Sequence, residues 1–166
     1  WRGAKGGTIL RVDGLAHNAR YEGFVLDSAG IADIGILHAN YARFETEVLH
    51  RNLHLIGFKK SGIHMELNWR NEGDKFATAE TVFENCIFED CNTGVWSGSF
   101  NDYNHTFQFC EFIKCKTGIY YARGNFYLRN SHFYKSSDLD IFFSGEHGSS
   151  IRRVSSHGSR RFVKNA

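Results

Sequence analysis

Apolar and polar residues alternate over short stretches along the whole chain, without the period of an amphipathic helix. The clearest stretches are FENCIFEDCNTGVW, residues 83–96, and FQFCEFIKCKTGIY, residues 107–120. Alternation that lasts only a few residues before a turn is typical of short β-strands with one buried face. The pattern therefore predicts an all-β chain built from many short strands.

These two stretches are copies of one repeat, offset by 24 residues. Weaker copies begin at Tyr21, Leu53, Leu128 and Ile151. Repeats of this length without helical periodicity predict a solenoid, in which stacked coils bury the side chains that one coil cannot bury alone. The unequal repeat lengths indicate that one corner accepts insertions, the longest at residues 68–81. The predicted inner ladder runs through Leu26, Phe58, Phe88, Phe112 and Phe133.

The repeated pattern N-C-x-F-x-x-C-x-x-G-[IV] resembles the right-handed parallel β-helix superfamily that includes the pectate lyases, from Tyr21 to Val163. The resemblance implies one single-stranded β-helix domain over residues 1–166, with about six coils and the clearest repeats at 53–163. It also implies a polysaccharide or glycan partner and an extracellular or cell-surface location in a bacterium or phage. The start at Trp1, the end at Ala166 and the lack of a cap helix suggest an excerpt of a longer β-helix.

Four cysteines form two C-x4-C pairs, Cys86/Cys91 and Cys110/Cys115. A zinc site of four thiolates is one interpretation, and disulfides between adjacent coils are another. The repeat favours a third, in which each cysteine stacks on its copy and points inward as a free, buried thiol. The serines at 131 and 136, which replace the cysteines in the next coil, support this interpretation.

The residue after each inward Ile or Val of the Gly-Ile landmarks is expected to point outward. If Ile36, Ile63, Val95, Ile119 and Ile141 face inward, an outer ladder follows at Leu37, His64, Trp96, Tyr120 and Phe142. We interpret its last four members as residues on which sugar rings stack. The alternative is that a neighbouring loop covers the ladder.

The loops after these strands carry the polar candidates for chemistry. Cleavage of a glycosidic bond needs two carboxylates, or a base beside a group that neutralises a uronate. The candidate catalytic residues are Glu66, Asp102, Glu146 and His147, and the candidate substrate-binding residues of the loops are Trp69, Arg70, Tyr103 and Arg123. Each residue alone can also be read as a solvated loop residue.

Composition adds few constraints. The formal net charge of +2 and the absence of a long apolar run predict neither nucleic-acid binding nor membrane insertion. A local basic group near the C-terminus, Arg152, Arg153, Arg160, Arg161 and Lys164, is read as a solvated face. We expect no metal and no cofactor; a calcium lyase would show clustered aspartates, and only Asp138 and Asp140 are close together.

The resemblance and the ladder together predict a lyase or glycosidase that cleaves an extracellular polysaccharide along the outer ladder. The alternative is a non-catalytic stalk, adhesin or tailspike segment that binds a glycan or a partner. A third hypothesis is a scaffold whose active site lies in another part of a longer protein.

Overall fold

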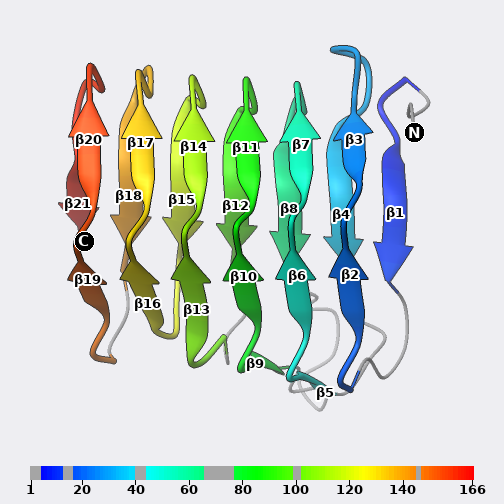
Figure 1. Cartoon of the computed structure of the whole chain (residues 1–166), viewed down its shortest axis with the longest axis horizontal. Helices are drawn as coiled ribbons and strands as arrows, with labels where there is room; N and C mark the ends of the chain where they lie inside the picture. The colour runs from blue at the N-terminus through cyan, green and yellow to red at the C-terminus, as the bar shows by residue number, and fades with distance from the viewer. Residues whose placement is uncertain (1–4, 13–16, 40–43, 66–76, 99–101, 145–146) are drawn as a thin grey trace.

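The chain folds as a β-solenoid, consistent with a right-handed parallel β-helix (Figure 1). The computed structural model describes residues 5–12, 17–39, 44–65, 77–98, 102–144 and 147–166. None of these residues is helical, and every strand pairing among them is parallel. The predicted all-β fold is therefore confirmed.

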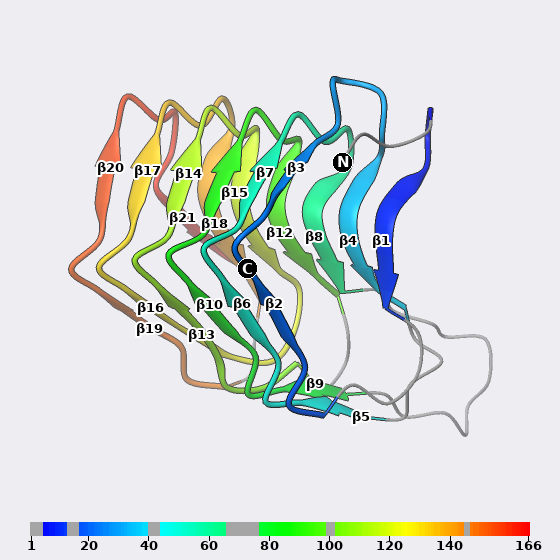
Figure 2. The same cartoon turned by 45° about the vertical axis from the view of Figure 1, so that its right-hand side comes forward.

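Each turn of the solenoid contributes one strand to each of three sheets (Figure 2). Sheet 1 contains β1 (Thr8–Val12), β4 (Ile34–His38), β8 (Ser61–Met65), β12 (Thr93–Ser97), β15 (Thr117–Tyr121), β18 (Leu139–Phe143) and β21 (Val163–Asn165). Sheet 2 contains β2 (Arg20–Glu22), β6 (Leu49–Arg51), β10 (Val82–Glu84), β13 (His105–Gln108), β16 (Phe126–Arg129) and β19 (Ser150–Arg152). Sheet 3 contains β3 (Val25–Asp27), β7 (His54–Ile56), β11 (Ile87–Glu89), β14 (Glu111–Ile113), β17 (His132–Tyr134) and β20 (Ser155–His157).

A small fourth sheet lies at the insertion corner, between the end of sheet 1 and the start of sheet 2. It pairs β5 (Phe44–Thr46) with β9 (Ala77–Ala79), and bridges to His17 and Tyr103 extend it. The predicted insertion therefore ends in an ordered strand. Its earlier part, residues 68–76, lies outside the described residues.

Stacked aromatic rings fill the core on the inner side of sheet 3. The ring of Phe112 lies 5.0 Å from that of Phe88 and 4.7 Å from that of Phe133, in nearly parallel planes. The predicted ladder is wrong at one step, because Leu55 and not Phe58 is in register with Phe88. Phe58 is buried three residues later, where its carbonyl accepts a hydrogen bond from the amide of Asn92.

The recurrent glycine at the start of the sheet 1 strands is required by the close approach of this ring stack. A Cβ on Gly94 would lie 2.6 Å from the carbonyl oxygen of Gly118 and 2.7 Å from the ring of Phe112. Gly62 is crowded in the same way, by the carbonyl of Gly94 and the ring of Phe88. Any larger residue would have to displace backbone as well as a packed ring.

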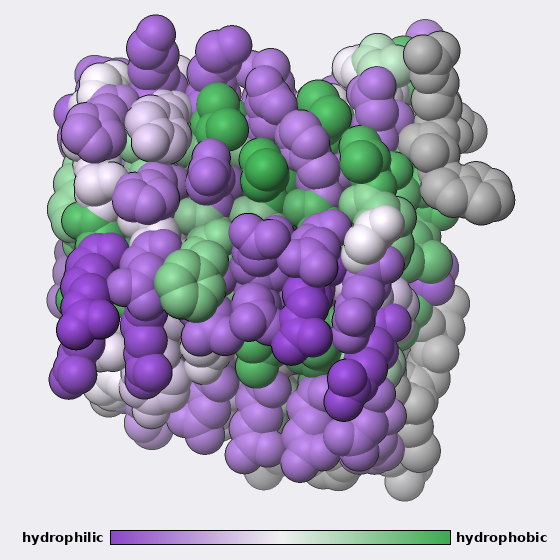
Figure 3. Space-filling model, viewed as in Figure 1, coloured by the Kyte–Doolittle hydropathy of each residue, from purple (hydrophilic) through white to green (hydrophobic). Residues whose placement is uncertain are grey.

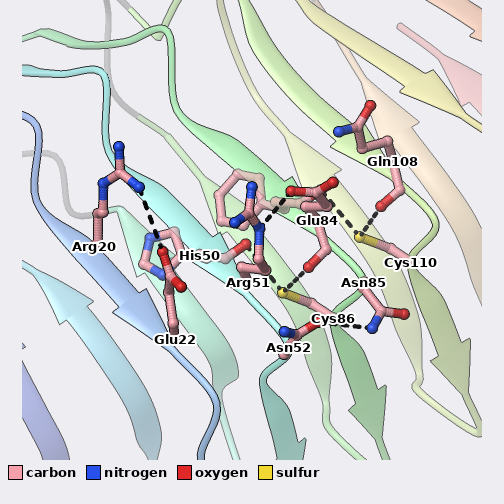
Figure 4. Close-up of polar contacts among 11 residues, drawn as sticks. Arg20, Glu22, His50, Arg51, Asn52, Glu84, Asn85, Cys86, Gln108 and Cys110 are labelled. Atoms are coloured by element: carbon pink, nitrogen blue, oxygen red, sulfur yellow. Dashed lines mark hydrogen bonds and ion pairs between the residues drawn. The ribbon is translucent and has the colours of Figure 1, made fainter.

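The corner between sheets 2 and 3 is two residues long, and its first residue is in the left-handed region. Asparagine tolerates this conformation, and Asn52, Asn85 and Asn130 occupy it with φ between 47° and 54°. The side-chain amide of Asn85 also donates to that of Asn52 at 2.8 Å (Figure 4). This hydrogen bond links two successive turns at the corner.

The four cysteines are free and buried, as the repeat predicted. The thiol of Cys86 donates to the carbonyl of His50 at 3.4 Å, and that of Cys110 to the carbonyl of Phe83 at 3.4 Å. Figure 4 shows both thiols, each also within hydrogen-bond distance of the carbonyl two residues before it in its own turn. Burial raises the pKa of the Cys110 thiol. Among the residues that the structure describes, no group of metal-ligating side chains comes together.

Candidate functional site

The predicted outer ladder of sheet 1 is present and in register. Leu37, His64, Trp96, Tyr120 and Phe142 are successive partners across β4, β8, β12, β15 and β18. Leu37 is only 5% exposed, whereas the other four are half-buried. The exposed part of the ladder therefore begins at His64, and it is aromatic throughout.

The rings of this ladder lie face to face. Their centroids are 4.2 Å apart for His64 and Trp96, 6.1 Å for Trp96 and Tyr120, and 4.6 Å for Tyr120 and Phe142. The interplanar angles are 12° or less. Each inner ring thus has a parallel ring on both sides, so its neighbours compete with a sugar ring for its faces. The ladder offers no series of open faces for sugar rings.

The indole of Trp96 also covers the backbone that follows it. A Cβ on Gly98 would lie 2.3 Å from the indole Cη2 atom, so the ring needs a glycine at this place. His64 is held on the other side of Trp96, where its Nδ1 atom lies 2.9 Å from the Ser61 hydroxyl. Burial, and to a smaller extent the charge of Lys60, lowers the pKa of His64 to about 4, so the ring is neutral at pH 7.

The Phe142 end of the ladder opens into a pocket of about 360 Å³. Its lining combines two rings of the ladder with polar and charged side chains: Thr117, Tyr120, Asp138, Leu139, Phe142, Arg161 and Lys164. The Lys164 ammonium lies 5.7 Å from the centroid of the Phe142 ring, and the Arg161 guanidinium donates to the Asp138 carboxylate. This hydrogen bond lowers the pKa of Asp138, so the pocket presents a fixed carboxylate and two cations.

Of the predicted catalytic residues, the structure describes only Asp102 and His147. Glu66, Trp69, Arg70 and Glu146 lie outside the described residues. Asp102 is fully buried, and its carboxylate accepts hydrogen bonds from the hydroxyls of Ser97 and Thr78. A side chain with this environment is inside the solenoid and does not reach a ligand on the outer face.

The remaining loop candidates lie where sheet 1 passes into sheet 2. The Tyr103 hydroxyl is 3.3 Å from Nε2 of His147, and the two rings meet edge to face at 5.0 Å. Arg123 is exposed two residues beyond β15. The structure therefore brings two of the predicted site residues, Tyr103 and His147, into contact with each other.

Buried polar groups behind this edge form a seam that sequence reasoning missed. His105 Nδ1 lies 2.5 Å from the Tyr121 hydroxyl, and its Nε2 lies 3.1 Å from the carbonyl of Thr78. Nearer the N-terminus, Nε2 of His38 lies 3.1 Å from Nε2 of His50. Burial lowers the pKa of His50 well below its usual value and raises that of Tyr121. His50 and Tyr121 therefore stay neutral at pH 7.

Five pocket residues were not predicted as site residues: Thr117, Asp138, Leu139, Arg161 and Lys164. A signal for one of them exists in the sequence. Lys164 follows Phe142 by 22 residues, which is close to the repeat length, and the structure pairs the two residues across β18 and β21. Extending the outer ladder by one more copy would have placed a cation on Phe142.

Comparison with models of protein families, with curated proteins and with solved structures gives no match to this chain. Within the described residues, no helix has the length and apolar character needed to cross a membrane.

Proposed function

We propose that this chain is a non-catalytic β-solenoid module that binds a glycan in the pocket at the Phe142 end of the outer ladder. The observation that carries the proposal is the combination of Tyr120 and Phe142 with Asp138, Arg161 and Lys164 around one pocket. A few fixed polar groups beside an apolar wall are typical of small-ligand sites. Sugars match them, because each ring has an apolar C–H face and a rim of hydroxyl groups.

The ring geometry favours glycan binding at one end of the ladder over binding along its whole length. The rings between His64 and Phe142 stack on one another, so a polysaccharide running along the whole ladder would compete with neighbouring rings for their faces. At the last ring, the Asp138 carboxylate can accept hydrogen bonds from sugar hydroxyls, and the Arg161 guanidinium can donate to them. The Lys164 ammonium would add attraction for an acidic sugar.

We keep the relationship to the pectate-lyase-like superfamily, and with it an extracellular or cell-surface location, as parts of this proposal. They rest on the repeat and on the solenoid fold. A cleaving enzyme is the less supported reading, because the buried Asp102 carboxylate is turned away from the outer face. Binding needs no second carboxylate, whereas hydrolysis does.

A glycan panel tests the proposal. At least one oligosaccharide should bind the wild-type chain. Phe142→Ala and Asp138→Asn should each lower the affinity for the tightest-binding oligosaccharide by at least about tenfold, or about 1.4 kcal/mol. His64→Ala, at the far end of the same ladder, is the matched control and should leave the affinity unchanged.

The ligand should be recovered intact from the same mixtures. Release of reducing ends, or absorbance from unsaturated uronates, would overturn the non-catalytic assignment. Equal losses in the His64 and Phe142 variants would place binding along the ladder and not in the pocket.

A further inference from the structure

Charge is unevenly divided along the chain. Residues 1–113 contain ten Lys and Arg against fifteen Asp and Glu, whereas residues 114–166 contain ten against three. Because the chain advances along the solenoid axis turn by turn, the described residues of the two parts are also divided in space (Figure 1). The net charge of +2 therefore conceals a basic end, and the last turns attract anions.

The outer face of sheet 2 shows where this charge is left unbalanced. One outward position runs in register through Glu22, Arg51, Glu84, Gln108, Arg129 and Arg152. At its start the charges alternate, and Arg51 Nε lies 2.6 Å from Glu84 Oε2 (Figure 4). At its end two arginines are direct partners, and no carboxylate of the described residues lies within ion-pair distance of either. Like charges in this position repel, and an added anion would relieve the repulsion.

An exposed aromatic side chain stands beside this arginine pair. Phe109 occupies the corner between sheets 2 and 3, where the neighbouring turns carry Asn85 and Asn130. Its φ of 55° is an uncommon conformation for a bulky residue, yet its side chain is 53% exposed and, among the described residues, has no ring partner. Packing within the chain therefore does not account for this residue. Because every described turn has a positive φ at this corner, the backbone conformation belongs to the fold, and only the choice of an exposed phenylalanine is unexplained.

We propose that Phe109, Arg129 and Arg152 form a docking surface for an acidic amphipathic helix of a partner protein. Phe109 follows Gln108, so the three side chains come from three successive turns of the solenoid. Adjacent turns are about 4.8 Å apart, which places them at about 0, 4.8 and 9.6 Å along the axis. Residues i, i+3 and i+7 of an α-helix rise by about 0, 4.5 and 10.5 Å and share one face.

The match fixes the chemistry of the partner. An apolar residue at i packs on Phe109, and carboxylates at i+3 and i+7 meet the guanidinium groups of Arg129 and Arg152. Arginine suits this role because its planar fork binds a carboxylate through two parallel hydrogen bonds. The Arg129 guanidinium already lies 6.0 Å from the centroid of the Tyr127 ring, which limits its freedom before binding.

The shape of the surface favours a protein over a flexible polyanion. Figure 2 shows the chain bending between sheets 2 and 3, and Phe109 is an exposed residue of this bend. The face that Figure 3 displays is mostly hydrophilic, and strongly hydrophilic side chains lie over β16 and β19. Aromatic and arginine side chains together are characteristic of the centres of protein interfaces. This surface lies on a different sheet from the proposed glycan pocket and does not depend on it.

Fluorescence anisotropy with a labelled, alanine-rich helical peptide tests the proposal. The probe carries Leu at i and Glu at i+3 and i+7, and its partner peptide has the same composition with the two Glu on the opposite face. The first peptide should bind the full chain and weaken as salt is raised. The joint variant Arg129→Ala/Arg152→Ala should weaken it by at least about tenfold, and Phe109→Ala by about fivefold.

The matched control is Lys114→Ala/Lys135→Ala, which removes the same charge from neighbouring turns at the far corner of sheet 3. It should change the affinity by less than about twofold. A charge exchange guards against misfolding: Arg129→Glu should lose the Glu peptide and regain a peptide with Lys at i+3. Equal binding of both peptides, equal loss in the lysine control, or no binding at all would overturn the proposal. Tighter binding of heparin that ignores Phe109→Ala would reassign the surface to polyanions.

Discussion

The two faces of sheet 1 carry ladders of the same register that are specified in different ways. On the inner face, Ile63, Val95 and Ile119 are fully buried, and their size is fixed by the rings and backbone around them. On the outer face, Trp96 and Tyr120 are half-buried and touch mainly each other along the stack. The inner ladder is therefore constrained on all sides, and the outer ladder only along the axis.

This difference teaches where the repeat defines structure and where it leaves room for function. Inner positions tolerate little, because protein interiors are packed without spare volume. Outer positions need a flat side chain that stacks, which histidine, tryptophan, tyrosine and phenylalanine all provide. The chain can vary its outer chemistry turn by turn without changing the coil.

The largest expected effect comes from deleting a ring inside the solenoid, on sheet 3, in place of a ring on the outer face of sheet 1. Phe112→Ala removes a fully buried ring between two others and should lower the free energy of unfolding by about 4 kcal/mol. Phe142→Ala removes a half-buried ring from the outer stack and should cost about 1 kcal/mol. Urea denaturation followed by circular dichroism measures both. Similar losses would show that the outer rings are as constrained as the rings inside the solenoid.

A single added methyl group should sharpen the contrast on the inner side. Gly94→Ala places a Cβ against the carbonyl of Gly118 and the ring of Phe112, and should cost about 3 kcal/mol. Gly148→Ala is the control, since a Cβ there meets nothing within 4 Å, and it should stay within about 0.5 kcal/mol of wild type. If the Gly94 variant unfolds at the wild-type urea midpoint, the close approach is not rigid.

The sequence predicted these ladders because both follow from the repeat. Equal spacing brings Phe88 to Phe112 and Trp96 to Tyr120 whatever the loops do. The error at Phe58 arose where two apolar residues of one coil, Leu55 and Phe58, both matched the pattern. Register is decided there by backbone pairing, which a residue type alone does not reveal.

The candidate site was less predictable for a physical reason. Loops between the sheets vary in length, so the repeat does not set the direction of their side chains. Asp102 looked like a loop carboxylate, but the hydroxyls of Ser97 and Thr78 hold it inside. The ring stack was predicted from alternation, but alternation gives no ring planes, so the covered faces became visible only in the structure.

Lowering the pH should destabilise the protein through His64 of the outer ladder. Because the folded state keeps the pKa of His64 at about 4 against 6.5 in the unfolded chain, the unfolded chain binds the proton first as the pH falls. The free energy of unfolding is therefore highest above pH 6.5 as far as His64 is concerned. It falls by roughly 2–3 kcal/mol as the pH is lowered from 6.5 towards 4. His64→Phe should keep the stack and remove this part of the pH dependence. An unchanged pH profile in that variant would contradict the assignment.

The smallest effect on stability is expected for Cys110→Ser, because the next turn already has a serine, Ser131, at the equivalent position. Ser131 follows Cys110 in the next turn, where its hydroxyl donates to the carbonyl of Arg129 at 2.8 Å and accepts from the amide of Cys110 at 3.1 Å. A hydroxyl therefore fits a position equivalent to the thiol. Cys110→Ser should cost no more than about 1 kcal/mol, because the carbonyl of Phe83 remains to accept its hydrogen bond. Thermal unfolding with and without added zinc measures this cost and tests the free thiols together. A zinc-dependent rise in the wild-type midpoint that Cys110→Ser removes would show that the cysteines do more than fill the core.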